Sequence, residues 1–427
     1  MSEKKHIVDI LRERGCLEDS TGEALYERLK RPVRLYCGFD PTSDSLHVGN
    51  LLPMIVLARF QRCGHQPVVV LGGATGKIGD PGGKSVERPL LDLDVIQRNI
   101  EGIRRNFERL FDTSDPKTAP LFLNNDAWFG EFPLIDFLRD VGRHYRVNAM
   151  LAKEGVRTRL ESQEGISFTE FSYMLMQGYD FLHLFRDYGV ELQIGGSDQW
   201  GNITSGIDLV RRVCGEPVHG LTLPLLTRSD GKKFGKSEGG AVWLSREKLP
   251  VYDFYQYFMR LPDADVGKLM RFLTFMELEE IRELEAGFAR GDLPPNALQK
   301  RLAEEMTRFI HGQEGLEEAQ KITEQLAPGA ETELSAQSLE ALTQSTPSSH
   351  LMREEVVGKS VVDVLVAVGL QPSKGAARRL VDNGGVYLNN LKVTEASAEV
   401  SADDLVDGKY LLLAVGKKNK HVVSLRD

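Results

Sequence analysis

Short apolar segments alternate with longer segments of helical periodicity over the first 227 residues, and this alternation constrains the fold most. Residues 33–39 are interpreted as a short buried strand, and residues 67–73 form a continuous apolar run, which is typical of a strand covered on both faces. Turn-forming residues and then a helical pattern follow them, at residues 46–62 and 91–111. The sequence therefore predicts an α/β fold, a Rossmann-like doubly wound parallel sheet that binds ligands at the carboxyl ends of its strands.

The same patterns predict the other elements of this part of the chain. Strands are expected at residues 119–123 and 190–195, and the clearest helix at 166–188. Helical segments at about 126–160 are interpreted as an insertion. Residues 6–30 are expected to form a single helix that packs on the body.

Composition divides the rest of the chain. Residues 246–326 are helical in pattern, whereas 327–352 contain proline and glycine but no lysine or arginine, which indicates a linker with one short helix. Residues 353–427 combine two helical segments, a hairpin pattern and a basic tail. We therefore expect an α/β domain over residues 1–245, an all-α domain, a linker and a small α+β domain.

A strand, a turn and a helix follow one another in residues 34–50. Such a loop, which enters a helix N-terminus, presents unpaired N–H groups to an anion such as a triphosphate. His47 and Asn50 lie three residues apart on the first turn, and Gly49 between them permits close approach of a ligand. The alternative is an ordinary strand–helix unit with a surface histidine.

A second stretch, residues 227–240, combines glycines, lysines and a hydroxyl. Lys233 and Lys236 lie three residues apart, beside Ser237, and suit the neutralisation of charge on a transferring phosphoryl group. The alternative is a solvated basic loop.

Overall composition limits the possible partners and compartment. The net charge of −9 argues against a protein that grips nucleic acid with its whole surface, so RNA contacts should be local patches. The four cysteines show no C-x-x-C pairing, and no metal-ligand cluster is evident. Without a signal-like or membrane-spanning segment, the chain is expected to be cytoplasmic and to have no membrane partner.

The sequences H-x-G-N at residues 47–50 and K-F-G-K-S at 233–237 resemble the two signatures of class I aminoacyl-tRNA synthetases. Nearly the whole chain resembles the bacterial tyrosyl-tRNA synthetases. The resemblance implies that the ATP phosphates are met by Thr42, His47, Lys233, Lys236 and Ser237. It implies that Asp40 and Asp198 help to hold the ammonium, the adenosine or the ribose, and that Gly49, Asn50, Gly195 and Gly196 shape the adenosine site. Asn50 replaces the second histidine of the usual signature, and Ser237 replaces a common threonine.

The long helix carries Tyr173, Gln177 and Asp180, spaced by four and then three residues, so all three project from one face. The alternative is an exposed polar edge of the helix. The resemblance implies that Tyr173 and Gln177, with Asp80, meet the α-ammonium of tyrosine, and that Asp180 and Tyr36 meet its phenol hydroxyl. Further pocket residues implied are Gln193 and Gln199, with Asn124 and Asn125 as looser candidates and Cys37 as either a ribose neighbour or a buried structural cysteine.

The C-terminal part resembles the αL RNA-binding module of a ribosomal protein and of pseudouridine synthases. Its helical segment at 373–383 and its basic tail supply the candidate tRNA contacts Lys374, Arg378, Arg379, Lys417, Lys418 and Lys420. The alternative is a small domain with an ordinary solvated basic face.

The resemblance as a whole implies an enzyme that activates L-tyrosine with ATP and transfers it to tRNA(Tyr). ATP with Mg²⁺ would be a substrate complex, with no tightly bound cofactor and no protein metal site. The family further implies a homodimer formed through residues 126–160. Two alternatives stay open: a tryptophanyl-tRNA synthetase, and a non-catalytic RNA-binding protein built on a synthetase fold.

Overall fold

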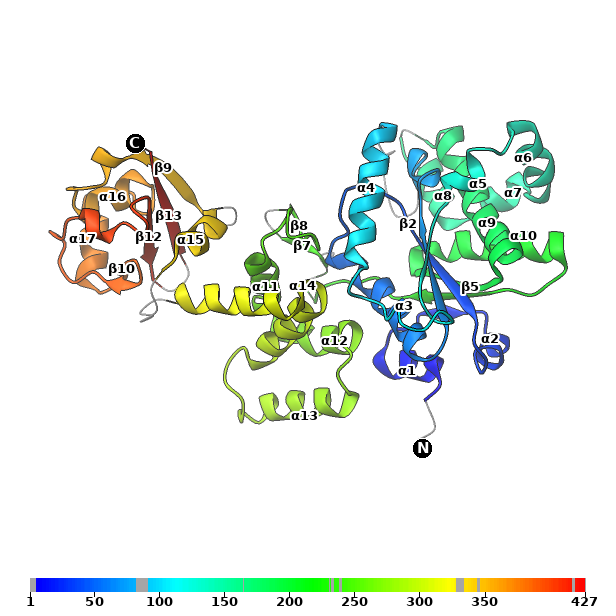
Figure 1. The fold of residues 1–427 in the computed structure, drawn as a ribbon, viewed down its shortest axis with the longest axis horizontal. Helices are drawn as coiled ribbons and strands as arrows, with labels where there is room; N and C mark the ends of the chain where they lie inside the picture. Colours follow the sequence, from blue (N-terminus) through cyan, green and yellow to red (C-terminus); the bar gives the residue numbers. More distant parts are fainter. Residues whose placement is uncertain are drawn as a thin grey trace. The chain divides into compact units, whose positions relative to one another are not determined.

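The protein is represented by a computed structural model that divides into two compact units (Figure 1). The first unit comprises Met1–Lys248 with Phe258–Ile310, and the second comprises Leu249–Tyr257 with His311–Asp427. The structure describes residues 5–81, 91–163, 165–229, 231, 234–237, 240–327, 334–343, 346–416 and 419–426.

A six-stranded sheet forms the centre of the first unit, in the order β1-β6-β5-β2-β3-β4. All neighbouring strands are parallel except the edge strand β1, which pairs antiparallel with β6. The strands are β1 (Asp19–Ser20), β2 (Arg34–Phe39), β3 (Gln66–Leu71), β4 (Leu121–Asn124), β5 (Val190–Gly196) and β6 (His219–Leu223). This is the predicted doubly wound parallel sheet.

Helices cover the sheet, and their ends follow local sequence signals. In α9 (Phe168–Tyr188), the Ser167 hydroxyl accepts a hydrogen bond from the Glu170 amide, and Gly189 ends the helix at φ +63°. The other helices of this part are α3 (Leu51–Arg62), α4 (Leu93–Asn106), α5 (Asp126–Phe129), α6 (Leu134–Asp140), α7 (Val147–Leu151), α8 (Glu154–Leu160) and α10 (Trp200–Cys214). All six positions of β3 are buried, as expected for a strand covered on both faces.

The prediction of one helix over residues 6–30 is wrong. The chain forms α1 (Ile7–Arg14), the edge strand β1 and α2 (Glu23–Arg28). Gly15, at φ +73°, ends α1 with a left-handed residue, and Asp19 and Ser20 then pair with β6. The helical periodicity did not reveal that a sheet edge would capture these two residues.

Residues between 251 and 325 are helical, as the pattern predicts. The helices are α11 (Val251–Met259), α12 (Asp263–Leu273), α13 (Leu278–Ala289) and α14 (Ala297–Gln325), the last interrupted at Gly312. Before them, β7 (Lys236–Ser237) and β8 (Gly240–Ala241) form a small hairpin.

The second unit contains a five-stranded sheet in the order β11-β10-β12-β13-β9. Its elements are α15 (Ala336–Thr343), β9 (Ser348–Met352), α16 (Val361–Ala367), α17 (Lys374–Asp382), β10 (Val386–Leu388), β11 (Leu391–Lys392), β12 (Tyr410–Val415) and β13 (Asn419–Arg426). The predicted hairpin is present, with Asn389 and Asn390 at positive φ in its turn.

Part of the range predicted to be a linker, residues 327–352, is folded. Strand β9 pairs in parallel with β13, and Leu339 and Leu342 of α15 share a buried cluster with Tyr410. The one short helix expected in this range is present as α15, whereas the polar composition of the range hid the strand β9.

Candidate active site

The predicted site residues gather where four parallel strands end. The chain leaves β2 toward β3 and β4 and later returns to the other side of β2 as β5, so the strand order reverses between β2 and β5. Such a reversal opens a crevice at the carboxyl ends of the strands, where ligands bind in open α/β sheets. Helix α9 brings a second set of polar side chains to the same place.

The two signature stretches are in contact although they lie far apart in the sequence. His47 begins the short helix Val48–Asn50 that leads into α3; its Nδ1 accepts from the Gly49 amide at 3.0 Å, and its own amide donates to Asn50 Oδ1 at 3.2 Å. A Cβ atom on Gly235 would lie 2.8 Å from the Gly49 nitrogen. The second stretch therefore packs directly against the entrance of α3, and Asn50 supports the turn that carries His47.

Asp40, directly after β2, lies at the centre of a hydrogen-bond chain. Its Oδ2 accepts from the Tyr173 hydroxyl at 2.9 Å, and its Oδ1 accepts from the Thr75 hydroxyl at 2.9 Å. Thr75 in turn accepts from the side-chain amide of Asn125 at 2.9 Å. A Cβ on Gly72 would lie 2.3 Å from Asp40 Oδ1, so glycine permits this close approach.

Asp180 is buried and is held by two donors. The Trp128 indole N–H donates to Oδ1 at 2.8 Å, and the Asn125 side chain donates to Oδ2 at 3.2 Å. Burial raises the pKa of Asp180 to about 8, and the two hydrogen bonds oppose this rise by favouring the carboxylate.

Tyr36, on β2, is 1% exposed and packs edge-on against Phe181. Its hydroxyl is buried and has no hydrogen-bond partner among the described residues. Burial, and then the nearby Asp180 carboxylate, raise its pKa well above the ordinary value. The hydroxyl therefore keeps its proton and can donate a hydrogen bond.

A second group of polar side chains joins α9 to the loop after β5. Gln199 donates to Asp80 Oδ2 at 2.6 Å and accepts from the Gln177 side chain at 3.3 Å. Gln193 on β5 is buried, and its Oε1 has no partner in the described part of the chain. The pKa of the Tyr173 hydroxyl is raised well above its ordinary value, first by burial and then by the carboxylates of Asp40, Asp80 and Asp180. The surroundings are thus anionic and favour a cationic group such as an ammonium.

The loop after β5 is tightly packed. A Cβ on Gly196 would lie 2.5 Å from Asp198 Oδ1, and one on Gly195 would lie 3.0 Å from the Gln199 Cβ. The two glycines thus leave room for the side chains of the next turn. Cys37 on β2 is buried, and burial raises its pKa to about 12, so its thiol stays protonated.

Several predicted residues are not brought into these contacts. Thr42 follows β2 and is exposed. Lys233 lies outside the described residues, and for Lys236 and Ser237 only the backbone of β7 is described.

On the C-terminal module, Lys374, Arg378 and Arg379 are exposed on α17, where Lys374 pairs with Asp363 at 2.6 Å. The Lys420 ammonium donates to the Leu326 carbonyl at 2.6 Å and is thus tied to its own unit. Lys417 and Lys418 lie outside the described residues.

Sequence reasoning missed two members of the site, Thr75 and Trp128, and left Asn125 as a loose candidate. All three follow the carboxyl ends of β3 and β4, which was the available signal. Their partners, Asp40 and Asp180, come from other elements, so only the fold reveals the contacts.

The doubly wound sheet and the joined signature stretches define a class I aminoacyl-tRNA synthetase. The family "tRNA synthetases class I (W and Y)" matches residues 27–327, and the "Tyrosine--tRNA ligase SYY-like C-terminal domain" matches residues 338–423. The tyrosine–tRNA ligase of Protochlamydia amoebophila is 53% identical over 422 residues, 99% of each chain. The chloroplastic/mitochondrial tyrosine–tRNA ligase of Arabidopsis thaliana is 50% identical, over 99% of this chain and 84% of the relative.

A solved structure agrees. The C-terminally truncated mitochondrial tyrosyl-tRNA synthetase of Aspergillus nidulans superposes with a TM-score of 0.68 and 30% identity, covering 76% of this chain and 95% of that one. The chain belongs to the tyrosine–tRNA ligase family. The family that matches residues 27–327 includes tryptophan as well as tyrosine enzymes. The family that matches the C-terminal residues and the two relatives above are named for tyrosine.

Two further findings concern metals and membranes. The described residues contain no group of three or more His, Cys, Asp or Glu side chains placed to hold a metal ion. Within the same residues, every helix is too short or too polar to span a bilayer.

Proposed function

We propose that the chain activates L-tyrosine with ATP at the crevice between β2 and β5 and then transfers it to the 3′ end of tRNA(Tyr). The observation that carries this proposal is that the Asp180 carboxyl group and the Tyr36 hydroxyl, here called the buried pair, are both buried and close enough for Asp180 to raise the pKa of Tyr36. The activation is a displacement in which the tyrosine carboxylate attacks the α-phosphorus of ATP and pyrophosphate leaves. Such a step needs positioning and charge stabilisation rather than an enzyme nucleophile.

The phenol hydroxyl of tyrosine would donate to Asp180 and accept from Tyr36. Phenylalanine lacks this hydroxyl. It would leave the buried Tyr36 hydroxyl without a partner and would take one hydrogen bond from the buried Asp180, which is unfavourable. This is a rejection for which tyrosyl-tRNA synthetases are themselves the standard example. Trp128 and Asn125 support it because they hold the Asp180 carboxylate in place.

The α-ammonium would lie near Tyr173, Gln177 and Asp80, where the carboxylates of Asp40 and Asp80 create a negative environment. Gln193 and Gln199 would line the same pocket. ATP would lie over three glycines of the two loops, Gly49, Gly195 and Gly196. Asp40, Asn50 and Asp198 would lie toward the adenosine or ribose. Thr42, His47, Lys233, Lys236 and Ser237 would meet the phosphates as charge develops.

Mg²⁺ would enter with ATP. The phosphate oxygens would be its principal ligands, because Mg²⁺ commonly retains several waters and binds through substrate phosphates. It would neutralise charge on the departing pyrophosphate.

The tRNA would be bound by the C-terminal part of the chain. We assign the helical residues 246–326 to the anticodon stem and the small domain at 353–427 to further RNA contacts. Arg378 and Arg379, exposed on α17, are the best-supported contacts, whereas Lys374 would have to exchange its ion pair with Asp363. The reaction is expected in the cytoplasm, with its tRNA and ATP.

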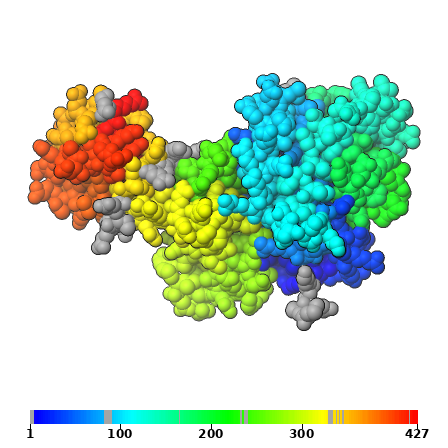
Figure 2. All heavy atoms as spheres, viewed as in Figure 1, coloured from blue at the N-terminus to red at the C-terminus, as the bar shows by residue number. Residues whose placement is uncertain are grey.

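We infer a homodimer from exposed apolar side chains on the first unit, where α6 and α7 lie at one edge of this unit (Figures 1 and 2). Leu134 and Ile135 are 70% and 72% exposed, and Val147 is 60% exposed. Large apolar side chains exposed to this extent mark interaction surfaces where they lie together. A second copy of the chain would cover them.

The test is the formation of acid-stable tyrosyl-tRNA from labelled L-tyrosine, ATP, Mg²⁺ and tRNA(Tyr). Charging of tRNA(Tyr) but not tRNA(Trp), dependent on each component, is the expected result. A folded protein that charges neither would contradict the proposal.

A further inference from the structure

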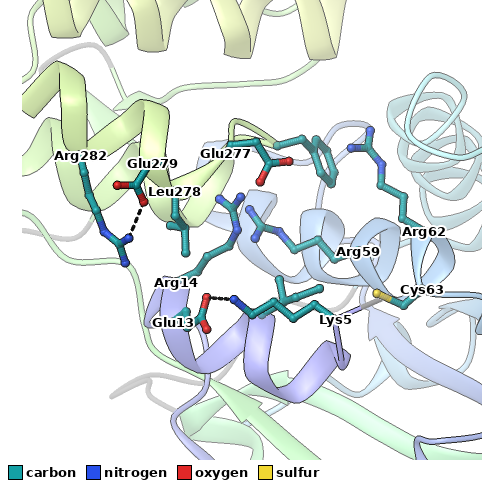
Figure 3. A pocket seen from close by; sticks show the side chains of 12 residues that line it. Lys5, Glu13, Arg14, Arg59, Arg62, Cys63, Glu277, Leu278, Glu279 and Arg282 are labelled. Carbon is teal, nitrogen blue, oxygen red and sulfur yellow. Dashed lines mark hydrogen bonds and ion pairs between the residues drawn. The ribbon is translucent and has the colours of Figure 1, made fainter. Parts of the chain in front are cut away.

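A cavity of about 480 Å³ lies at the far end of α3 from His47, within the first unit. It is bounded by α1, by the last turn of α3 and by the start of α13 (Figure 3). The proposed reaction uses none of its side chains. It is therefore distinct from the candidate active site.

The charges around this cavity do not balance. Five basic side chains face three acidic ones, giving a net charge of +2 in a chain whose total is −9. Lys5 pairs with Glu13, and Arg282 pairs with Glu279 at 2.8 Å. Three guanidinium groups remain, those of Arg14, Arg59 and Arg62, and Glu277 is the one acidic side chain of the lining that remains to balance them. None of the three forms an ion pair with a carboxylate in the described ranges.

Two of these arginines are deeply buried, Arg14 at 7% and Arg59 at 4% exposure. Figure 3 shows their guanidinium groups side by side, facing Glu277. Their like charges act on each other: burial, and then Arg14, lower the pKa of Arg59 to about 9. Buried charges are normally paired, so two adjacent unpaired guanidinium groups are unusual.

Both arginines also serve the end of α12. Arg14 donates to the backbone carbonyls of Arg271, Thr274 and Met276, and Arg59 Nη2 donates to those of Arg271, Phe272 and Thr274, the last at 2.5 Å. These acceptors are neutral carbonyl groups. A helix C-terminus offers only about half a negative charge, so these contacts leave most of the positive charge uncompensated. The Arg59 Nε is also buried, and no described atom accepts from it.

We propose that this cavity binds a small anion that carries a phosphate group. Arginine forks match phosphate oxygens in bidentate fashion, and the cavity volume lies in the range of small-ligand sites. Arg62 is held at the mouth, its guanidinium carbon 3.3 Å from the Phe275 ring centroid. A bound anion ties α1, α3 and the connection from α12 to α13 together. A nucleic-acid backbone is less suitable, because its phosphates would have to reach arginines that are more than nine-tenths buried.

The test uses the full chain, with inorganic phosphate and pyrophosphate as probes. The thermal unfolding midpoint is followed in increasing sodium phosphate, with sodium chloride keeping the ionic strength constant, and dissociation constants are measured by calorimetry. A saturable rise of the midpoint in phosphate is expected. Arg62→Gln, which removes an exposed charge at the mouth, should weaken binding about tenfold, as expected for one charged hydrogen bond.

Arg98→Gln, on the exposed face of α4 and away from the cavity, is the matched control and should leave binding unchanged. The proposed active site would also bind phosphates, so only the part of the phosphate binding that is weakened in Arg62→Gln is assigned to the cavity. This variant should keep tyrosine-dependent pyrophosphate exchange. Arg59→Met should abolish phosphate binding in the cavity. If this variant fails to fold, the dissociation constants of Arg62→Gln still test the proposal. Equal midpoints in phosphate and chloride, or equal dissociation constants for Arg62→Gln and the unaltered chain, would overturn the proposal. So would binding of an RNA oligonucleotide, but of neither probe, that depends on Arg62.

Discussion

Replacing Trp128 with phenylalanine should make tyrosine binding depend more steeply on pH. The ring can still stack on His183, which it contacts at a centroid distance of 4.5 Å, but the donor to Asp180 Oδ1 is lost. A hydrogen bond to a charged group contributes about 1.5 kcal/mol or more, so the pKa of Asp180 should rise by about one unit. The variant thus changes the ionisation of the carboxylate rather than the shape of the pocket.

The direction of the pH effect on tyrosine affinity follows from the ionisation state of Asp180 that binds tyrosine. The phenol hydroxyl donates to ionised Asp180, so affinity should increase as the pH rises through the pKa, which is about 8 in the unaltered chain. At pH 7 about one tenth of the carboxyl groups is ionised, and an increase of one unit lowers this to about one hundredth. Tyrosine should therefore bind about tenfold more weakly to Trp128→Phe at pH 7, but only about twofold more weakly at pH 9.

Equilibrium dialysis with labelled tyrosine measures the ratio of the two affinities, that of the unaltered chain and that of Trp128→Phe. The range from pH 6.5 to about 9 is chosen because it includes the raised pKa of Asp180. Tyr179→Phe is the matched control: it removes a hydroxyl from the same aromatic cluster, whereas Asp180 keeps both its donors. A Trp128→Phe ratio that does not change with pH would refute the proposed ionisation. So would unchanged tyrosine affinity.

Three further changes test other parts of the account. Gly235→Ala should slow pyrophosphate exchange more than tenfold, because its Cβ would lie 2.8 Å from the Gly49 nitrogen. Gly231→Ala, also at positive φ but in open space, is the control and should retain most activity. Equal losses in the two variants would contradict a role for the contact between the two signature stretches. Ile135→Glu should convert a dimer into monomers in sedimentation velocity, whereas an unchanged mass would remove the proposed interface. Reversing Arg378 and Arg379 to glutamate should raise the KM for tRNA about tenfold and leave exchange unchanged, and a normal KM would dismiss these contacts.

The sequence was sufficient for the architecture where periodicity and burial agree. Continuous apolarity in residues 67–73 predicted β3, and a serine before and a glycine after α9 mark its ends. The failures have a common cause. Strand β9 and the edge strand β1 exist because β13 and β6 capture them, and a short polar segment carries little sign of such pairing.

The same reasoning applies to the site. Tyr173, Gln177 and Asp180 were placed together by helical spacing, which is local information. Trp128 and Thr75 act through Asp180 and Asp40, which belong to different elements, so no local pattern identifies them. The cavity lined by Arg14, Arg59 and Arg62 likewise unites residues from helices that are distant in the sequence.

The most direct test of the central claim is ATP–pyrophosphate exchange by the purified chain with tyrosine, phenylalanine and tryptophan offered separately. Exchange driven by tyrosine alone is predicted, because only tyrosine supplies the hydroxyl that satisfies Asp180 and Tyr36. Exchange driven equally by phenylalanine would contradict the role of this buried pair. Exchange driven by tryptophan instead of tyrosine would contradict the amino-acid assignment itself.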